Sequence, residues 1–147
     1  MKHIITIIAL IFTVNSFSQS KRERIDALKV TYITEKLDLT EKEAQQFWPI
    51  YNAYDDVTDK IKYGELKKIR REVKENATTI SNERANELLD KIAIALEKLH
   101  EEEVKLNNKL KKIIPPKKII LLKIAEEDFK KRMFEEWKKR REQKRNK

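Results

Sequence analysis

The chain has 147 residues, of which 34 are lysine or arginine and 25 are aspartate or glutamate, with one glycine, three prolines and no cysteine. A single glycine excludes the glycine-rich phosphate loops of nucleotide-binding α/β folds, and the shortage of turn residues excludes an all-β fold. The richness in Glu, Lys, Leu and Ile is typical of long helices, so we expect an all-α protein with one helical domain.

Residues 1–18 have the pattern of a secretory signal peptide. A short basic start is followed by an uncharged, largely apolar run of eleven residues from Ile4 to Val14, and Ser16 and Ser18 are small residues before the expected cut. The run is too short for a spanning helix, which needs about 20 apolar residues. We therefore expect cleavage after Ser18 and a periplasmic protein, with an uncleaved anchor as the alternative. The mature charge is then +8, because only Lys2 is lost from a total of +9.

Apolar residues at helical spacing predict four helices, over about residues 21–37, 40–74, 81–113 and 116–144. The first carries the stripe Ile25, Leu28, Tyr32 and Ile33. The second begins with a capping box, in which Thr40 and Glu43 each satisfy a free backbone donor of the other. Its stripe is Ala44, Phe47, Tyr51, Tyr54, Val57 and Ile61.

Two residues inside the second helix are expected to weaken it. Pro49 lies well past the first turn, where it removes a backbone hydrogen bond and predicts a kink. Gly64 is a second weak point. In the third helix Ala85, Leu89, Ile92, Leu96 and Leu99 form the stripe, which resumes at Leu106, Leu110 and Ile113 after a charged step at Glu103.

Pro115 ends the third helix and Pro116 begins the fourth, since proline suits a first helical turn. The start of this last helix is apolar around its whole circumference, which favours a dimer interface or partner surface over plain core; the residues are Ile119, Ile120, Leu121, Leu122 and Ile124. Residues 19–137 are the expected domain. Residues 138–147, with seven basic side chains and one acidic, are expected to be a solvated, fraying tail.

An aromatic cluster in the second helix is a further candidate for partner binding. Phe47, Tyr51 and Tyr54 lie on one narrow arc, and Trp48 projects about a quarter turn away. Most such stripes are core, but an exposed subset with polar tips would grip a partner or an unfolded chain.

The sequence offers little chemistry. His100 and Glu103, three residues apart on one helical face, are the only candidate metal ligands, and a solvated acidic face is the simpler interpretation. No residue can be assigned a catalytic role, so we expect neither an enzyme nor a cofactor. Export argues against nucleic acid, leaving acidic proteins and anionic membrane surfaces, the latter through the basic tail, as partners for the positive charge.

Two segments resemble a known family. Residues 39–54, from Leu39-Thr40 through Phe47-Trp48-Pro49 to Tyr54, resemble the first motif of the periplasmic LTxxQ group of Spy- and CpxP-like proteins, most closely its Bacteroidetes branch, commonly labelled sensors of ECF-type sigma factors. Ile114-Pro115-Pro116-Lys117-Lys118 stands where a second motif would be. Glu43 and Lys118 replace the glutamines of the two motifs, and Pro115 replaces a threonine.

The resemblance implies long antiparallel helical hairpins, often in a cradle-shaped dimer, and a role in envelope stress. The histidine- or methionine-rich ligand sets of metal-sensing relatives are missing. We therefore expect an exported, non-enzymatic, chaperone-like protein that holds unfolded or acidic polypeptides through a basic-rimmed apolar surface. The alternatives are a regulator that docks on one membrane signalling partner of a sigma-factor system, and a metal-binding sensor.

Overall fold

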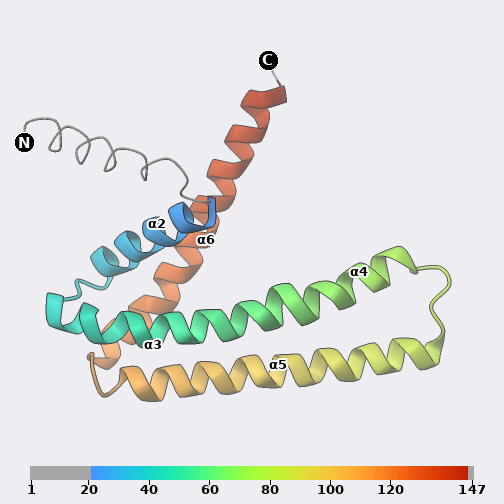
Figure 1. Ribbon diagram of the computed structural model, residues 1–147, viewed down its shortest axis with the longest axis horizontal. Coiled ribbons are helices and arrows are strands. Elements are labelled where there is room, and N and C mark those ends of the chain that lie inside the picture. Colours follow the sequence, from blue (N-terminus) through green and yellow to red (C-terminus); the bar gives the residue numbers. More distant parts are fainter. Residues whose placement is uncertain (1–20, 146–147) are drawn as a thin grey trace, which may run out of the picture. The chain divides into compact units, whose positions relative to one another are not determined.

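The computed structural model describes residues 21–145, so the expected signal peptide lies outside the described residues. Every regular element in that range is helical, which confirms the all-α class; the elements are α2 (Lys21–Lys36), α3 (Glu41–Asp59), the π-helix η1 (Lys60–Leu66), α4 (Lys67–Glu75), α5 (Asn82–Leu110) and α6 (Pro116–Arg145) (Figure 1). Because α3, η1 and α4 follow one another without a break, the four predicted helical segments are all present.

Residues between the helices end and begin them through local contacts. Asp38 adopts a left-handed backbone conformation with φ of 47°, which ends α2. The Thr40 side chain accepts from the Glu43 backbone N–H and the Glu43 carboxylate accepts from the Thr40 backbone N–H, so the capping box of α3 is confirmed. Ser81 caps α5 in the same way by accepting from the Arg84 backbone N–H.

The two predicted weak points of the second helix lie in different surroundings. Pro49 lies inside α3, where the helix continues past it. Gly64 lies within η1, in which the backbone pairs one residue further along than in an α-helix. Gly64 has no positive φ, and a Cβ built there meets nothing within 4 Å. Neither space nor backbone conformation therefore requires glycine at this position.

The chain divides into two compact units, each described here by itself. The hairpin unit comprises residues 39–121, in which α3, η1 and α4 run antiparallel to α5 and lie beside it (Figure 1). The paired-helix unit comprises α2 with residues 122–145 of α6. Its buried residues are Ile33, Leu37, Leu122, Ala125 and Phe129.

The seam of the hairpin unit follows alternating steps of four and three residues, as two helices that wrap around each other require. Phe47, Tyr51, Thr58 and Ile61 are buried on one side, and Leu88, Ala95, Leu106 and Leu110 on the other. Between Leu99 and Leu106 the seam position is Glu102, whose carboxylate binds Lys105 Nζ at 2.7 Å. This hydrogen bond raises the pKa of Lys105.

Three residues of the predicted stripes are not in the seam. Leu89 and Leu96 are 62% and 54% exposed, and Val57 is also exposed while its neighbour Thr58 is buried. The prediction was wrong at these positions because it chose Val57, Leu89 and Leu96 where the structure buries the adjacent residues Thr58, Leu88 and Ala95. A small residue, Ala95, and a polar one, Thr58, occupy seam positions instead. The Thr58 hydroxyl donates to the Asp55 carbonyl at 3.2 Å, which satisfies its donor in the core.

At the tip of the hairpin α4 has no buried residue, and ion pairs connect it to α5. The Arg84 guanidinium binds Glu72 through two parallel hydrogen bonds of 2.6 and 3.0 Å and also contacts Glu87. This forked pairing lowers the pKa of Glu72 and raises that of Arg84. The far end of the hairpin is therefore closed by surface ion pairs.

Candidate functional site

A groove runs between α2 and the second half of α6, within the paired-helix unit. One part of it is a cavity of about 570 Å³, a size typical of specific binding sites. Four apolar side chains form its floor: Ile25 and Leu28 from α2, and Met133 and Trp137 from α6. The groove continues into an adjoining cavity of about 400 Å³, which also contacts Leu28 and Met133.

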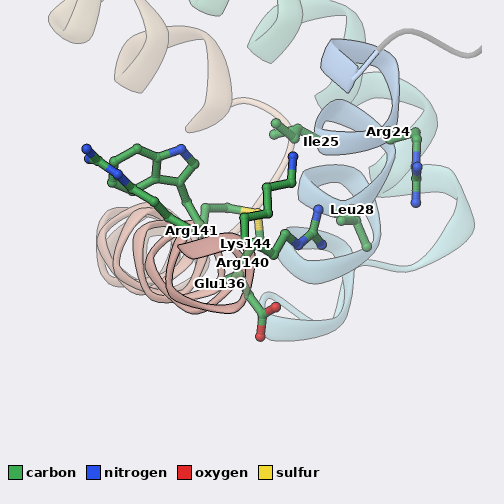
Figure 2. Close-up of a pocket in the computed structure, with 9 residues that line it drawn as sticks. Arg24, Ile25, Leu28, Glu136, Arg140, Arg141 and Lys144 are labelled. Carbon is green, nitrogen blue, oxygen red and sulfur yellow. The ribbon is translucent and has the colours of Figure 1, made fainter. Parts of the chain in front are cut away.

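Basic side chains line the rim of the larger cavity. Arg24 comes from α2, whereas Arg140, Arg141 and Lys144 come from the last turns of α6. Figure 2 shows Arg140 and Lys144 extending from α6 toward α2, and Glu136, the single acidic residue of this lining, pointing away from Ile25. The rim is thus positive above an apolar floor.

Trp137 belongs to the floor of the groove and contacts Arg141 of the rim. Trp137 is 54% exposed, although tryptophan is highly buried on average. The Arg141 guanidinium lies 5.3 Å from the ring centroid, within cation–π range, and Phe134 stacks obliquely at 6.0 Å. Tryptophan and arginine are both among the residue types enriched at the energetic centres of protein interfaces.

At the other end of the groove, two packed aromatic rings form part of the floor of the adjoining cavity. The rings of Tyr32 and Phe129 lie 5.7 Å apart and join α2 to α6. Two cations, Lys36 and Arg132, lie 5.6 and 5.9 Å from the Tyr32 ring centroid. The adjoining cavity itself has both signs of charge, with Glu35 and Glu136 beside Arg132 and Arg140.

The net charge of the expected mature chain is concentrated in the same unit. Residues 19–38 and 122–147 contain 16 basic and 10 acidic side chains, a surplus of six, whereas residues 39–121 contain 17 and 15, a surplus of two. The groove thus lies in the unit that attracts anions more strongly.

The aromatic cluster predicted for partner binding is divided between core and surface. Phe47 and Tyr51 are fully buried with stacked rings 5.4 Å apart, so they are core residues and not part of any surface. Trp48 meets both rings edge-on, and Tyr54 lies beside Tyr51; both are partly exposed. The bulk of this cluster stabilises the hairpin unit.

The apolar start of α6 is divided in the same way. Ile119 and Leu122 are buried, Leu121 is partly exposed, and Ile120 and Ile124 are 66% and 53% exposed. The helix is therefore not enclosed on all sides, and two isoleucines remain on the surface.

The two motif segments meet within the hairpin unit. Lys118 Nζ lies 2.8 Å from the Glu43 carboxylate, which also accepts from the Thr40 backbone N–H. This ion pair, with the cap, lowers the pKa of Glu43. Pro116 is the first residue of α6, and the Pro115 carbonyl accepts from the Lys118 backbone N–H at 2.9 Å. Leu39 is partly exposed. The two residues that depart from the motif glutamines are thus paired with each other.

The described residues offer no site for a metal ion. His100 is exposed and Glu103 partly so, and within residues 21–145 no three acidic or histidine side chains gather in a way that could hold one. No helix in this range has the length and apolar character needed to cross a bilayer.

The sequence contained a signal for the groove that the prediction did not use. From Trp137, steps of three, four and seven residues lead to Arg140, Arg141 and Lys144, the spacing of one helical face. The prediction treated these residues only as part of a basic, solvated tail; they are exposed, and α6 is helical through Arg145, where they line the groove.

Comparison of the chain with models of known protein families, with curated proteins and with solved structures found no match.

Proposed function

We propose that this chain is an exported, non-enzymatic protein that binds acidic polypeptides, including partly unfolded ones, through the groove of the paired-helix unit. The observation that carries the proposal is the apolar floor of Ile25, Leu28, Met133 and Trp137 beneath a basic rim. An apolar floor binds apolar side chains of a partner. A basic rim favours partners that have acidic residues next to those apolar side chains.

The proposed mechanism has two steps with different physical origins. The surplus positive charge of the unit acts over a distance of about one Debye length, roughly 10 Å at 0.1 M salt, and raises the rate of encounter. Contact with the apolar floor then slows dissociation, because each buried apolar side chain contributes about 1.5–3 kcal/mol. No covalent step is required.

The compartment and family are part of the same proposal. The apolar run of residues 4–14 supports export to the periplasm, and the capping box at Thr40 supports a distant relationship to the LTxxQ group. That relationship suggests a role in envelope stress. We further propose a homodimer, supported by the exposed Ile120 on α6.

The test is suppression of aggregation with two reduced client proteins of similar size, one acidic and one basic. We expect a substoichiometric amount of the protein to slow light scattering by the acidic client several-fold more than by the basic one. Raising salt from about 20 to 300 mM should reduce the difference, because the Debye length falls several-fold. Equal effects on both clients, or none on either, would contradict the proposal.

A regulator that docks on one membrane signalling partner is the second candidate. It is favoured by the small extent of the groove, whose two adjoining cavities of about 570 and 400 Å³ would fit one partner segment better than a broad range of clients. Crosslinking in intact cells from a photoreactive residue at position 137 separates the two functions. One stoichiometric product indicates a dedicated partner, whereas a broad distribution of products indicates clients.

A further inference from the structure

We infer that the groove binds its polypeptide as an amphipathic α-helix whose apolar face is flanked by acidic residues. This inference rests on the proposed function and adds the conformation and side-chain pattern of the partner. It follows from three properties of the groove: the backbone that lines it, the spacing of its floor residues and the charge of its rim.

The backbone of the groove favours a helical occupant. Both walls are α-helices, α2 and α6, whose interior N–H and C=O groups are already paired within each helix. An extended chain laid on this floor would find no strand edge to pair with, and its buried backbone groups would lose their hydrogen bonds to water. A helix satisfies its own backbone and presents only side chains.

The floor residues have the spacing that a helix face requires. On α2, Ile25, Leu28 and Tyr32 follow at steps of three and four. On α6, Phe129 and Met133 are four apart, and Trp137 follows four residues later. Each row spans about two helical turns, roughly 10–12 Å. A third helix with apolar residues at positions i, i+3 or i+4, and i+7 matches both rows at once.

Charge selects among the helices that would fit. The rim of the larger cavity contains Arg24, Arg140, Arg141 and Lys144 against one carboxylate, Glu136. A partner with glutamate or aspartate beside its apolar face places those carboxylates opposite the rim. The last turns of α6 are themselves strongly basic, so α6 of a second copy would meet like charge. The occupant is therefore an acidic segment of another protein.

The experiment measures binding of three synthetic peptides, each about 16 residues long, to the full chain carrying Trp48→Phe. This change leaves Trp137, in the floor, as the single tryptophan reporter. The first peptide has leucines at i, i+4, i+7 and i+11 with glutamates flanking them. The second has the same composition with the leucines dispersed around the helix. The third replaces each glutamate of the first by lysine.

We expect the first peptide to shift Trp137 emission to the blue and to bind at least about tenfold more tightly than the other two, as differences in burial and charge of this kind produce. Circular dichroism should show helix formation on binding. Calorimetry with the unaltered chain repeats the comparison, so a fold defect from Trp48→Phe cannot decide the result. Circular dichroism of the variant alone checks its fold.

Two matched variants locate the site on α6. Arg140→Gln with Arg141→Gln removes two rim charges and should weaken the first peptide about tenfold or more, in the range of interfacial charge pairs. Lys138→Gln with Lys139→Gln removes the same charge from the same helix at residues that do not line the groove, and should change affinity less than about threefold.

The outcomes separate this inference from the proposed function. If the dispersed peptide binds as tightly as the first, the helical requirement is overturned while polypeptide binding stands. If the lysine peptide binds equally well, the charge selection is overturned. If no peptide binds and a long-chain alkyl sulfate does, both proposals fail, because the groove then serves an anionic amphiphile.

Discussion

The carboxylate of Glu43 performs two tasks in the hairpin unit. It accepts the Thr40 backbone N–H at 2.8 Å as half of the capping box, and it binds Lys118 Nζ at 2.8 Å. One side chain therefore fixes the start of α3 and connects it to the start of α6. The ion pair with Lys118 requires a charged carboxylate, whereas the cap requires only an acceptor oxygen. The two tasks can therefore be separated by mutation and by pH.

The cap itself predicts a measurable loss. Thr40→Ala removes the hydroxyl that accepts from the Glu43 backbone N–H and should lower the free energy of unfolding by about 1 kcal/mol, as loss of a helix N-cap does. Urea unfolding followed by circular dichroism measures this change. Thr78→Ala, in the exposed loop after α4, is the control and should have little effect. An unaltered midpoint for Thr40→Ala would show that the cap does not support the fold.

The ion pair predicts a pH dependence. The Lys118 hydrogen bond, and then the Thr40 backbone, hold the pKa of Glu43 below its usual value near 4.5, so the folded state favours the charged form. The resulting stability is present above pH 4.5 and is lost as the pH falls through the lowered pKa. Glu72 and Glu83, whose pKa values are also lowered, act in the same direction.

Comparison with one neutral variant isolates the contribution of Glu43. Glu43→Gln retains an acceptor for the cap but cannot titrate, so its stability should fall less steeply than that of the unaltered chain between about pH 5 and pH 3. Glu41→Gln is the control, because Glu41 takes part in neither the capping box nor the ion pair with Lys118, and this variant should keep the steep dependence. Parallel curves for the chain and Glu43→Gln would show that the ion pair does not contribute.

Within η1, glycine costs stability that alanine should restore. Gly64→Ala adds a Cβ that meets nothing within 4 Å, on a backbone without positive φ, and removes conformational freedom from the unfolded chain. We expect the free energy of unfolding, measured by thermal unfolding, to rise by about 0.5–1 kcal/mol. Ala53→Gly, at an exposed position of α3, should cost a similar amount. A destabilised Gly64→Ala would indicate that η1 requires glycine for a reason other than space.

Helices and caps could be predicted from the sequence because their determinants are local. Thr40 and Pro116 start their helices as expected, since each acts through neighbours within one turn. The seam could be predicted only in part. Whether Leu89 or Leu88 enters the core depends on the partner helix, and seven residues of π-helix in η1 shift the register of that partner in a way no local pattern shows.

The candidate groove depends on contacts between distant parts of the chain. Ile25 and Trp137 are separated by more than a hundred residues, and only packing of α2 beside α6 brings them to one cavity. The individual stripes were predictable, and so was an apolar surface with a basic rim. Its location was not, because the predicted candidates Phe47 and Tyr51 pack into the hairpin core.

At the scale of the whole molecule, the surface of α6 predicts self-association. Ile120 is exposed within a segment that is otherwise apolar, and burying it against a second copy would remove it from water. We expect light scattering to give the mass of a dimer, and Ile120→Glu to give a folded monomer. Lys117→Glu, an exposed change of charge one turn earlier, is the control. A monomeric unaltered chain would contradict the proposed dimer.

The pairing of Glu43 with Lys118 has a consequence for how this sequence can diverge. A change at either residue alone leaves a partner's charge uncompensated, so the two positions should vary together among descendants of a common ancestor. The exchange of the two charges is not equivalent, because position 43 must also accept the Thr40 N–H and lysine has no acceptor. Position 43 should therefore stay glutamate or glutamine. Where it is glutamate, position 118 should be lysine, and where it is glutamine, position 118 should be a neutral residue.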